Sequence, residues 1–421
     1  MSIKLVTFAA LAFCVCSCSK SSSEAPTADT GGDDEDTSPL PCTAEVNKGP
    51  WVVAVDAAHA KIRWESCVTT AGTVTVTPEA GGTSIKATAS VQVAVTTDSP
   101  GAPFSDAQDI AGTWYENEVA LAGLAESTCY TYVIDRDPTA KGRFCTARKA
   151  GEPFTFAAVG DTNPGLDRRF QQVETRVFQG AYPIDFTLHM GDIQYYSSGT
   201  DPYQAWFPMM APILRRGAMF PAMGNHEHEE PHEMVEMVQR FWGGQGFDGT
   251  DRYFDFQSGG IWFLSIDTEL DYGPDSVQMK WLVGRLDAVS KLPGYRFSVV
   301  YQHRPMWTCG DSDDHPDEQA YLAPYFKKYK VPLVMWGHMH GYERFVSDGT
   351  TYLTTAGGGG LLGNVDKTAA AKAYCSGDTN LRKASGKWIH AVVFDVTSGE
   401  LRGRAIDQAG TIKDDFTIPA P

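Results

Sequence analysis

The chain has 421 residues, 42% of them apolar and 11% aromatic, which is enough to fill the cores of two or three globular domains. Asp and Glu outnumber Lys and Arg by 52 to 35, so the formal net charge is -17 at pH 7. This charge argues against general attraction to nucleic acid or to an anionic membrane surface. An anionic substrate would need a local concentration of positive charge.

Residues 1–17 are typical of an export signal. Lys4 precedes the apolar stretch LVTFAALAFCV, which is too short to span a bilayer comfortably. The tetrapeptide VCSC that follows resembles a bacterial lipobox, with Cys18 as the lipidated first residue of the mature protein. This predicts an exported bacterial membrane lipoprotein, periplasmic or at the cell surface. The alternatives are lipidation at Cys14 or Cys16, or an ordinary signal with incidental cysteines.

Residues 18–41 predict a lipid-anchored, disordered tether. The segment contains Ser, Gly, Pro and a run of acidic residues but almost no apolar ones, so it cannot bury enough surface to offset its ordering entropy. We interpret its DDED run as a spacer rather than a metal site, because nothing fixes the geometry of the carboxylates.

Six further cysteines suggest up to three disulfides in an exported chain, although 15 pairings are possible. Cys129 and Cys145 are expected to pair, because CYTYVI and GRFC are predicted to be neighbouring strands of a hairpin. The remaining pairs are hypotheses: Cys42 with Cys67, and Cys309 with Cys375.

Residues 42–150 predict an antiparallel β-sandwich. Short runs with period-two alternation, such as KIRWE, GTVTVTP and SVQVAVTT, are separated by Gly, Pro, Asp and Ser. Trp64 fits a buried strand tryptophan, and Leu124 with Tyr130 resembles the tyrosine corner of a fibronectin type III module. No residue pattern here indicates chemistry, so we expect a spacer or orienting domain; ligand binding by its loops is the alternative.

Residues 151–421 show a different pattern. Apolar strand-like runs alternate with helix-like segments, in which apolar residues recur every three or four positions: LDRRFQQVETRVFQG, VQMKWLVGRLDAVSK and EQAYLAPYFKKYK. This alternation predicts an α/β domain, in which ligand sites lie at the carboxyl ends of the strands.

Polar side chains follow five of these strand-like runs. FTFAAV is followed by residues 160–163, IDFTLHM by 191–195, MFPAM by 224–227, RFSVVYQ by His303 and VPLVMW by 337–340. Four of the five sets begin with a glycine, which we take to permit a tight turn. A single such residue is usually a helix cap or a satisfied core histidine, but five sets in one domain predict a metal site. Oxygen and imidazole donors suit iron, manganese or zinc, and the phenol of Tyr195 favours iron(III).

The series GD, GDxxY, GNHE, VxxH and GHxH, ending in GHMHGYER, resembles the purple acid phosphatase branch of the metallophosphoesterases. The resemblance covers residues 51–418, since a fibronectin-like module ahead of the catalytic domain is also a feature of that family. It implies a calcineurin-like α/β/β/α sandwich over residues 151–421. It also implies an acid phosphatase that hydrolyses phosphate monoesters through attack of a metal-bound hydroxide.

The resemblance also implies individual roles. It gives an iron(III) site formed by Asp161, Tyr195 and His340, a site for divalent zinc, iron or manganese formed by Asn225, His303 and His338, and a bridging Asp192. His226 is implied to bind substrate and donate a proton. Two departures stand out: Asn163 occupies a position that is usually glycine in this branch, and the loop after His303 lacks the family's paired histidines, which leaves His315 as a second candidate proton donor.

Charge counting agrees with an anionic substrate. Two aspartates and a phenolate set three negative charges against five positive charges of a trivalent and a divalent ion, and the excess can capture a phosphate dianion. The expected substrate is a phosphorylated small molecule or protein, with no nucleic acid partner. One alternative is a phosphodiesterase acting on nucleotides, phospholipids or glycans. Another is a surface binding protein with an inert catalytic domain, which the complete ligand set disfavours.

Other polar residues receive weaker interpretations. His228 and its acidic neighbours are expected in a solvated loop or helix start. Arg304 and Arg344 could contact phosphate or form salt bridges. The GGGG run at 357–360 lacks the Lys-Ser/Thr of a P-loop and predicts a turn. His189 is expected in the core.

Overall fold

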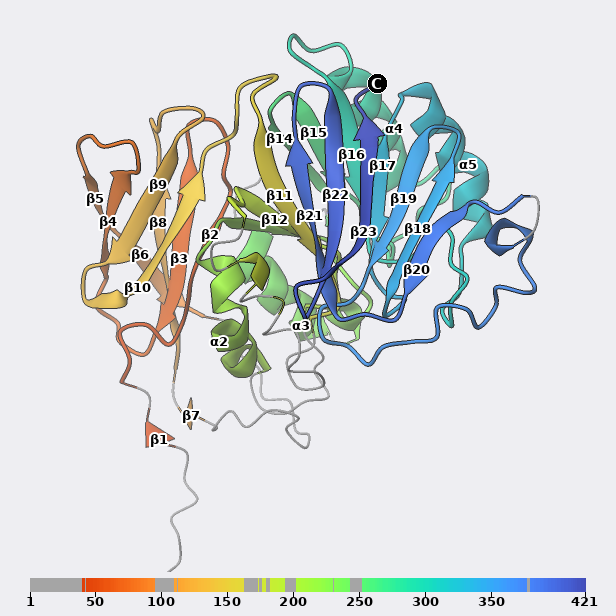
Figure 1. Cartoon of the computed structure of the whole chain (residues 1–421). Helices are drawn as coiled ribbons and strands as arrows, with labels where there is room; N and C mark the ends of the chain where they lie inside the picture. The colour runs from red at the N-terminus through yellow and green to blue at the C-terminus, as the bar shows by residue number, and fades with distance from the viewer. Residues whose placement is uncertain are drawn as a thin grey trace, which may run out of the picture. The chain divides into compact units, whose positions relative to one another are not determined.

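Figure 1 shows the computed structural model of the chain. It describes residues 40–41, 43–94, 110–111, 113–162, 173, 176–178, 182–193, 202–229, 231–242, 252–376 and 379–421. The predicted signal, Cys18 and nearly all of the tether lie outside these residues, as do Cys42, Asn163 and Tyr195. Pro39–Pro421 forms one compact unit. No helix in the described ranges is both long and apolar enough to cross a membrane.

The first part of this unit contains two four-stranded antiparallel sheets. The first has the order β2 (Lys48–Val53), β3 (Ala60–Ser66), β8 (Tyr115–Leu121) and β6 (Ser90–Val93). The second has the order β10 (Asp137–Cys145), β9 (Cys129–Ile134), β4 (Thr73–Pro78) and β5 (Ile85–Thr88). A short parallel pair joins β1 (Leu40–Pro41) to β7 (Ile110–Ala111). Trp64 is buried as predicted, and the hydroxyl of Tyr130 accepts the Ala125 N–H at 2.9 Å. The fibronectin type III identity of these sheets stays a prediction.

Two larger sheets follow. The six-stranded sheet has the order β13 (Ala218–Pro221), β12 (Phe186–His189), β11 (Phe154–Val159), β21 (His390–Val396), β22 (Glu400–Asp407) and β23 (Ile412–Pro419). The seven-stranded sheet has the order β14 (Phe254–Ser258), β15 (Ile261–Ser265), β16 (Phe297–Tyr301), β17 (Leu333–Trp336), β19 (Thr350–Thr355), β18 (Tyr342–Ser347) and β20 (Arg382–Gly386). Strands β11 to β13 run parallel, and so do β15, β16, β17 and β19.

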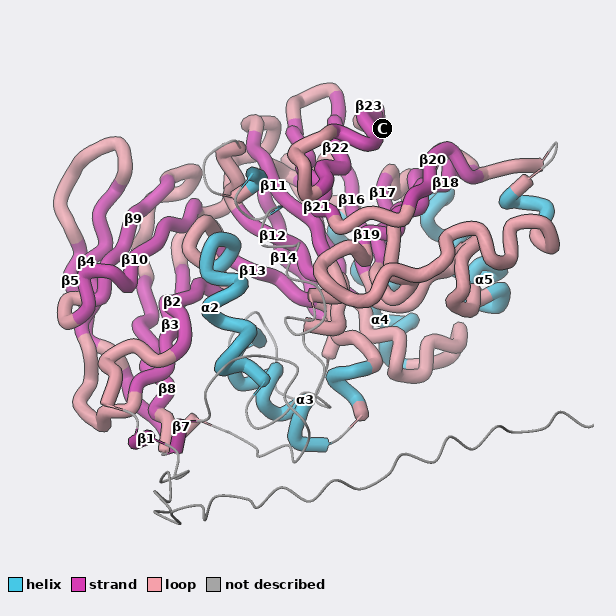
Figure 2. Tube along the Cα trace, turned by 60° about the horizontal axis from the view of Figure 1, so that its bottom comes forward, coloured by secondary structure: helices cyan, strands magenta, loops and turns pink. Residues whose placement is uncertain are grey.

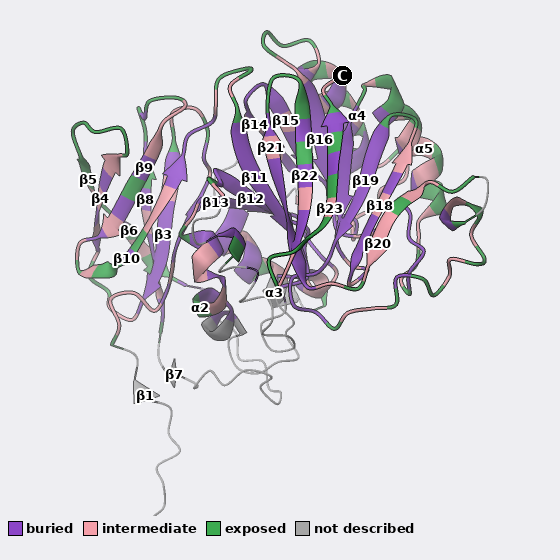
Figure 3. Ribbon diagram, viewed as in Figure 1, coloured by how far each residue is buried: buried purple, intermediate pink, exposed green. Residues whose placement is uncertain are grey.

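An aromatic core joins the inner faces of these two sheets. Phe186 of β12 packs edge-on against Phe256 and Phe263 of the other sheet, with ring centroids 5.4 and 5.3 Å apart. Figure 3 shows that the central strands of both sheets are buried along most of their length. Their near-continuous apolar runs are therefore explained by burial on both faces.

Helices α4 (Val277–Val289) and α5 (Pro316–Lys328) lie on the outer side of the seven-stranded sheet (Figure 2). Leu286 and Phe326 from these helices share one apolar cluster with Trp336 of β17. Both helices were predicted to within about two residues at each end, which is ordinary boundary error. The predicted helix at 166–180 falls mostly outside the described residues. The remaining helical elements are α2 (Pro202–Leu214), η2 (His226–His228), α3 (Pro231–Met237), η3 (Val238–Trp242) and η4 (Ala373–Cys375).

Two of the predicted disulfides are confirmed. Cys129 and Cys145 link β9 to β10, as the hairpin pattern indicated, and Cys309 is linked to Cys375. Cys67 is also disulfide-bonded, but its predicted partner Cys42 lies outside the described residues.

Candidate metal centre

The predicted ligands in the described part of the chain all follow parallel strands of the two large sheets. Strands β11, β12 and β13 lead to Asp161, Asp192 and Asn225, while β16 leads to His303 and β17 to His338 and His340. Parallel strands end at the same edge of their sheet, and the two sheets face each other. Six residues spread over 180 positions of sequence are therefore brought to one place.

The glycines before these ligands agree only in part with the predicted role of permitting a tight turn through their backbone freedom. Gly191 alone among the four takes a left-handed φ, at +83°. Gly224 and Gly337 are needed for space, because an added Cβ would lie 2.1 Å from Asp192 Oδ1 and 2.6 Å from Asp161 Oδ2, respectively. The left-handed backbone falls mostly on the ligands themselves, with φ of +60°, +53° and +65° at Asp161, Asp192 and His338. Such strained residues persist where their surroundings over-determine them, as at ligand sites.

Four side chains converge on one point. His303 Nε2 lies 3.0 Å from Asn225 Oδ1, 3.3 Å from Asp192 Oδ2 and 3.2 Å from His338 Nδ1. The other nitrogen of His303 donates to the carbonyl of Met190 at 2.7 Å, so Nε2 is an acceptor in the neutral imidazole. This nitrogen and the two oxygen atoms are all acceptors, and they repel one another unless a positive charge lies between them.

This donor set fits a metal ion. The ligand atoms of Asp192, His303 and His338 all lie within 4.8 Å of one another. One carboxylate oxygen, one amide oxygen and two imidazole nitrogens form a mixed oxygen and nitrogen set that suits zinc, iron(II) or manganese. The carbonyl of Met190 orients His303 in the way that outer partners commonly orient metal-binding histidines.

A second group of predicted ligands lies beside the first. His340 Nδ1 donates to the Leu361 carbonyl at 2.8 Å, which leaves Nε2 facing Asp161 Oδ1 at 3.3 Å. The other carboxylate contact of Asp161 is the backbone N–H of His338, at 3.1 Å. Tyr195, the third predicted ligand of this group, lies outside the described residues. The carboxylate of Asp192 acts on the pKa of both His338 and His340, as expected for a group between the two sites.

The pKa values reflect strong negative charge at these points. Burial disfavours the charged form of His303, but Asp192 outweighs burial and raises its pKa to about 10. Asp161 likewise outweighs burial at His340 and raises its pKa to about 9. Burial and then the charge of His303 lower the pKa of His338 to about 3. Since a ligand imidazole must be unprotonated, cation binding here is expected to release protons.

His226 borders the same space. Its Nε2 lies 3.8 Å from Asp192 Oδ2, and its Nδ1 lies 2.7 Å from Glu229 Oε1. Its side chain is 28% exposed, so a substrate can reach it. The contact between Glu229 and the His226 imidazole was not predicted from the sequence, where the residues after the GNHE motif were expected in a solvated loop or helix start.

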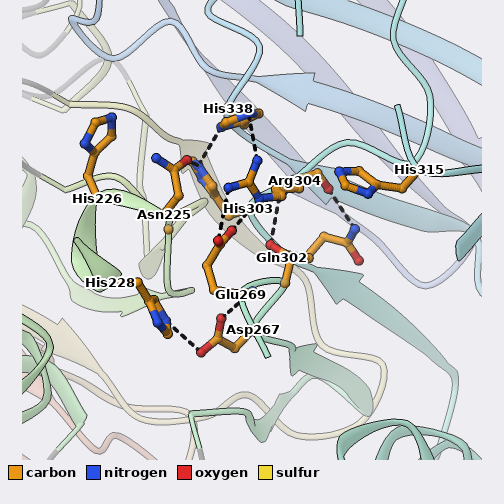
Figure 4. A network of polar contacts seen from close by, with 12 residues as sticks. Asn225, His226, His228, Asp267, Glu269, Gln302, His303, Arg304, His315 and His338 are labelled. Atoms are coloured by element: carbon orange, nitrogen blue, oxygen red, sulfur yellow. Dashed lines mark hydrogen bonds and ion pairs between the residues drawn. The ribbon is translucent and has the colours of Figure 1, made fainter. Parts of the chain in front are cut away.

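The solvated-loop interpretation is also wrong for His228, although the alternative of a helix start agrees with α3, which begins at Pro231. His228 Nε2 lies 3.0 Å from the fully buried Asp267, which also pairs with Arg252 at 3.4 Å. Figure 4 shows His228 and Asp267 below the predicted ligands. His228 therefore belongs to a partly buried charged network instead of facing solvent.

The two arginines differ in their surroundings. Arg304 forms a two-pronged ion pair with Glu269, and its Nη1 lies 3.3 Å from His338 Nε2 (Figure 4). Arg344 instead pairs with Asp414, which agrees with the salt-bridge interpretation. The candidate donor His315 precedes α5, and its Nδ1 lies 3.0 Å from the hydroxyl of Tyr272.

Two features of the site were not predicted from sequence. The buried carboxylate of Glu227 accepts three backbone N–H groups, from Asp192 at 2.9 Å, Ile193 at 2.8 Å and Gly224 at 2.7 Å. It thereby ties the turn after β12 to the turn after β13. Its place in the GNHE motif was the available signal. Burial and the charge of Asp192 raise its pKa to about 8.

The glycine run 357–360 is the second such feature. It follows β19, and the N–H of Gly360 donates to the Asp161 carbonyl at 3.0 Å. A Cβ on Gly360 would lie 2.6 Å from the His340 ring. This run is therefore part of the wall of the candidate metal centre, and its position directly after a buried strand was the signal that could have revealed it.

Comparison with known proteins gives a consistent picture. Residues 154–342 match the family model of calcineurin-like phosphoesterases. Human acid phosphatase type 7 is 28% identical over 267 residues, which cover 58% of this chain and 59% of the relative. Probable purple acid phosphatase 20 of Arabidopsis thaliana is 23% identical over 272 residues, or 60% and 62% of the two chains. Probable inactive purple acid phosphatase 9 of the same plant is 27% identical over 192 residues, or 37% and 29%.

The chain thus spans less than two thirds of the length of each of these relatives. Among solved structures, purple acid phosphatase PPD1 from yellow lupin seeds superposes with a TM-score of 0.70 at 18% identity, over 88% of this chain and 74% of the other. PhoD superposes with a TM-score of 0.60 at 11% identity, over 91% and 93%. At these identities the structural likeness shows a shared fold. The predicted resemblance to purple acid phosphatases is confirmed, while the fibronectin-like identity of the first two sheets is not addressed.

Proposed function

We propose that this chain, whose residues 154–342 form a calcineurin-like metallophosphoesterase domain, is a phosphatase that hydrolyses phosphate monoesters at a dinuclear metal centre. One observation carries the proposal: His303 Nε2 lies 3.0 Å from Asn225 Oδ1, 3.3 Å from Asp192 Oδ2 and 3.2 Å from His338 Nδ1. Asp161 and His340 form a contact of their own beside this group. We propose iron(III) held by Asp161, Tyr195 and His340, and zinc, iron or manganese held by Asn225, His303 and His338, with Asp192 shared.

Metal ions bound there would lower the pKa of a coordinated water and neutralise charge on a phosphoryl group. The protein's own residues set up that chemistry. Met190 and Leu361 fix the orientation of His303 and His340 through their carbonyls. Glu227 fixes the two turns that carry Asp192 and Asn225, so the ligands are held before any substrate arrives.

His226 is the proposed proton donor for the leaving group. Its imidazole is partly exposed, with Nε2 at 3.8 Å from Asp192 Oδ2 and Nδ1 at 2.7 Å from Glu229 Oε1. General acid catalysis of this kind typically contributes about 10²- to 10⁴-fold to the rate. We therefore expect His226→Ala to keep both metal ions and to lose activity within that range. Loss of metal with unchanged activity per bound metal would show that His226 is a ligand instead.

The direct test combines metal analysis with two assays. Purified protein should contain about two metal ions per chain, and it should hydrolyse an aryl phosphate monoester faster than the matching diester. Faster diester hydrolysis would favour the phosphodiesterase alternative. Two bound metals without hydrolysis of either ester would favour a binding protein with an inert catalytic domain. A visible charge-transfer band that disappears in Tyr195→Phe would support iron(III) bound by the phenolate.

We also propose that the protein is exported and lipid-anchored to a bacterial membrane through Cys18. The support is the apolar leader and the VCSC sequence, followed by a polar segment long enough to hold the folded unit away from the membrane. Cys18→Ala should abolish processing and membrane retention. A variant that fractionates with membranes as the parent does would refute the anchor.

A further inference from the structure

Arg304 stands next to the metal centre in an unusual environment. Its Nε and Nη2 both contact the carboxylate of Glu269, which holds the guanidinium in one orientation. The remaining nitrogen, Nη1, points away from Glu269 and lies 3.3 Å from His338 Nε2. The side chain of Arg304 is 28% exposed, so it is not sealed off from solvent. Figure 4 shows Arg304 between Glu269 and His338.

The contact between Arg304 and His338 has no hydrogen-bond acceptor once His338 acts as a metal ligand. His338 Nδ1 faces His303 Nε2 and the rest of the predicted donor set, so Nδ1 is the nitrogen that would bind the ion. A neutral imidazole that uses Nδ1 in this way carries its proton on Nε2. Arginine cannot accept a hydrogen bond, because its guanidinium remains protonated. Two donors would then face each other across 3.3 Å.

The outer nitrogen of a metal-binding histidine normally donates to an acceptor such as a carboxylate, a carbonyl oxygen or water. Within the described part of the chain, Arg304 is the group found at hydrogen-bond distance from His338 Nε2. An acceptor from outside the protein would satisfy both donors. A negatively charged oxygen does so best, since charge-assisted hydrogen bonds are roughly twice as strong as neutral ones.

We propose that Arg304 and the Nε2–H of His338 together bind a phosphoryl oxygen of the substrate, and that Glu269 holds Arg304 in position for this contact. The proposal rests on the proposed function and adds to it a residue that contacts the substrate's phosphate. Because Glu269 neutralises the charge of Arg304, the contribution of Arg304 to phosphate binding is mainly directional. Its Nη1 would fix the position of one phosphoryl oxygen, while the bound metal ions would supply the general electrostatic attraction.

Binding of inorganic phosphate tests this without relying on turnover. Isothermal titration calorimetry of metal-loaded Arg304→Ala should show phosphate affinity reduced by roughly 10- to 100-fold, the value of a hydrogen bond to a charged group. The metal content should stay that of the parent. In steady-state assays KM should rise more than kcat falls, and added guanidinium ion should restore part of the loss whereas urea should not.

Arg285 offers a matched control. It also forms a two-pronged ion pair, with Asp255, and the exposed fractions are similar: 34% and 13% for this pair against 28% and 16% for Arg304 and Glu269. It lies on α4 and contacts β14, on elements that carry no predicted ligand. Arg285→Ala should leave phosphate affinity unchanged. Glu269→Gln should weaken phosphate binding less than Arg304→Ala, because the guanidinium is still present but less constrained.

The outcomes separate this proposal from the proposed function. Parent-like phosphate affinity of Arg304→Ala at full metal content would overturn it, and so would loss of metal from that variant, since Arg304 would then be supporting His338. If Arg304→Ala does not fold, Arg304→Lys takes its place: weaker phosphate binding supports the proposal, and unchanged binding overturns it. A parent protein that binds phosphate through Arg304 but hydrolyses no ester would refute only the proposed function.

Discussion

Replacing Gly360 by alanine should displace His340 from the metal centre. The added Cβ would lie 2.6 Å from Cε1 and 2.7 Å from Nδ1 of the imidazole. Ordinary contact begins at 3.4 Å, so the ring must move by about 0.8 Å. The ring cannot do so freely, because Nδ1 is bonded at 2.8 Å to the carbonyl of Leu361, the residue after Gly360. Movement of the ring therefore separates Nε2 from Asp161.

The size of the effect follows from this geometry. Overpacking of a filled site costs about 1–3 kcal/mol, and a shift of about 1 Å in catalytic geometry can lower a rate on the order of 10²-fold. Gly360→Ala should therefore lose metal mainly from the group that contains Asp161 and His340, and most of its phosphatase activity. The backbone φ of Gly360 lies outside the left-handed region, so the effect is one of space alone.

Metal content by elemental analysis and turnover of a monoester would measure it. Gly284→Ala in α4 is the control, because an added Cβ there meets nothing within 4 Å. That variant should keep its metal and gain about 0.5–1 kcal/mol in stability, since alanine replaces glycine within a helix. Parent-like metal content and turnover in Gly360→Ala would refute the argument that the glycine run forms the wall of the site.

Three further outcomes can be measured by urea unfolding. Burial raises the pKa of Glu318 from 4.5 to about 8, so between these values the folded protein keeps a proton that the unfolded chain loses. As the pH rises from 4.5 towards 8, the free energy of unfolding should therefore fall by about 1.4 kcal/mol per pH unit because of this group, by a few kcal/mol in total. The variant Glu318→Gln lacks the titrating group and should not show this fall; an equal pH dependence of parent and variant would contradict the argument. In Glu227→Gln, the side-chain NH₂ would face a backbone N–H that now donates a hydrogen bond to the carboxylate, and this should lower the free energy of unfolding by about 1.5–3 kcal/mol. A loss below about 0.5 kcal/mol, the range of ordinary surface substitutions, would show that the link between the two turns is not stabilising. Cys309→Ser with Cys375→Ser opens a link across 66 residues and should cost about 4 kcal/mol on the chain-entropy estimate, and an unchanged unfolding midpoint would argue that the unfolded chain is already compact.

Sequence alone identified what is local along the chain. The buried strand FTFAAV, the helices near 277–291 and 318–330, and the polar residues that follow each strand were all predictable, because side-chain periodicity and strand ends are properties of neighbouring residues. Cys129 and Cys145 were predictable for the same reason, since they lie opposite each other in one hairpin.

Tertiary structure decided everything that depends on distant segments meeting. The contact of Gly360 with His340 depends on the order of β17 and β19 in the sheet, and Glu227 reaches the turn after β12 because β13 is its neighbour. Arg304 meets Glu269 across 35 positions and His338 across 34, so no local pattern distinguishes it from Arg344, which pairs with Asp414 instead. Residue types along a strand limit which chemistry is possible, but the register and packing of the sheets determine which atoms face one another.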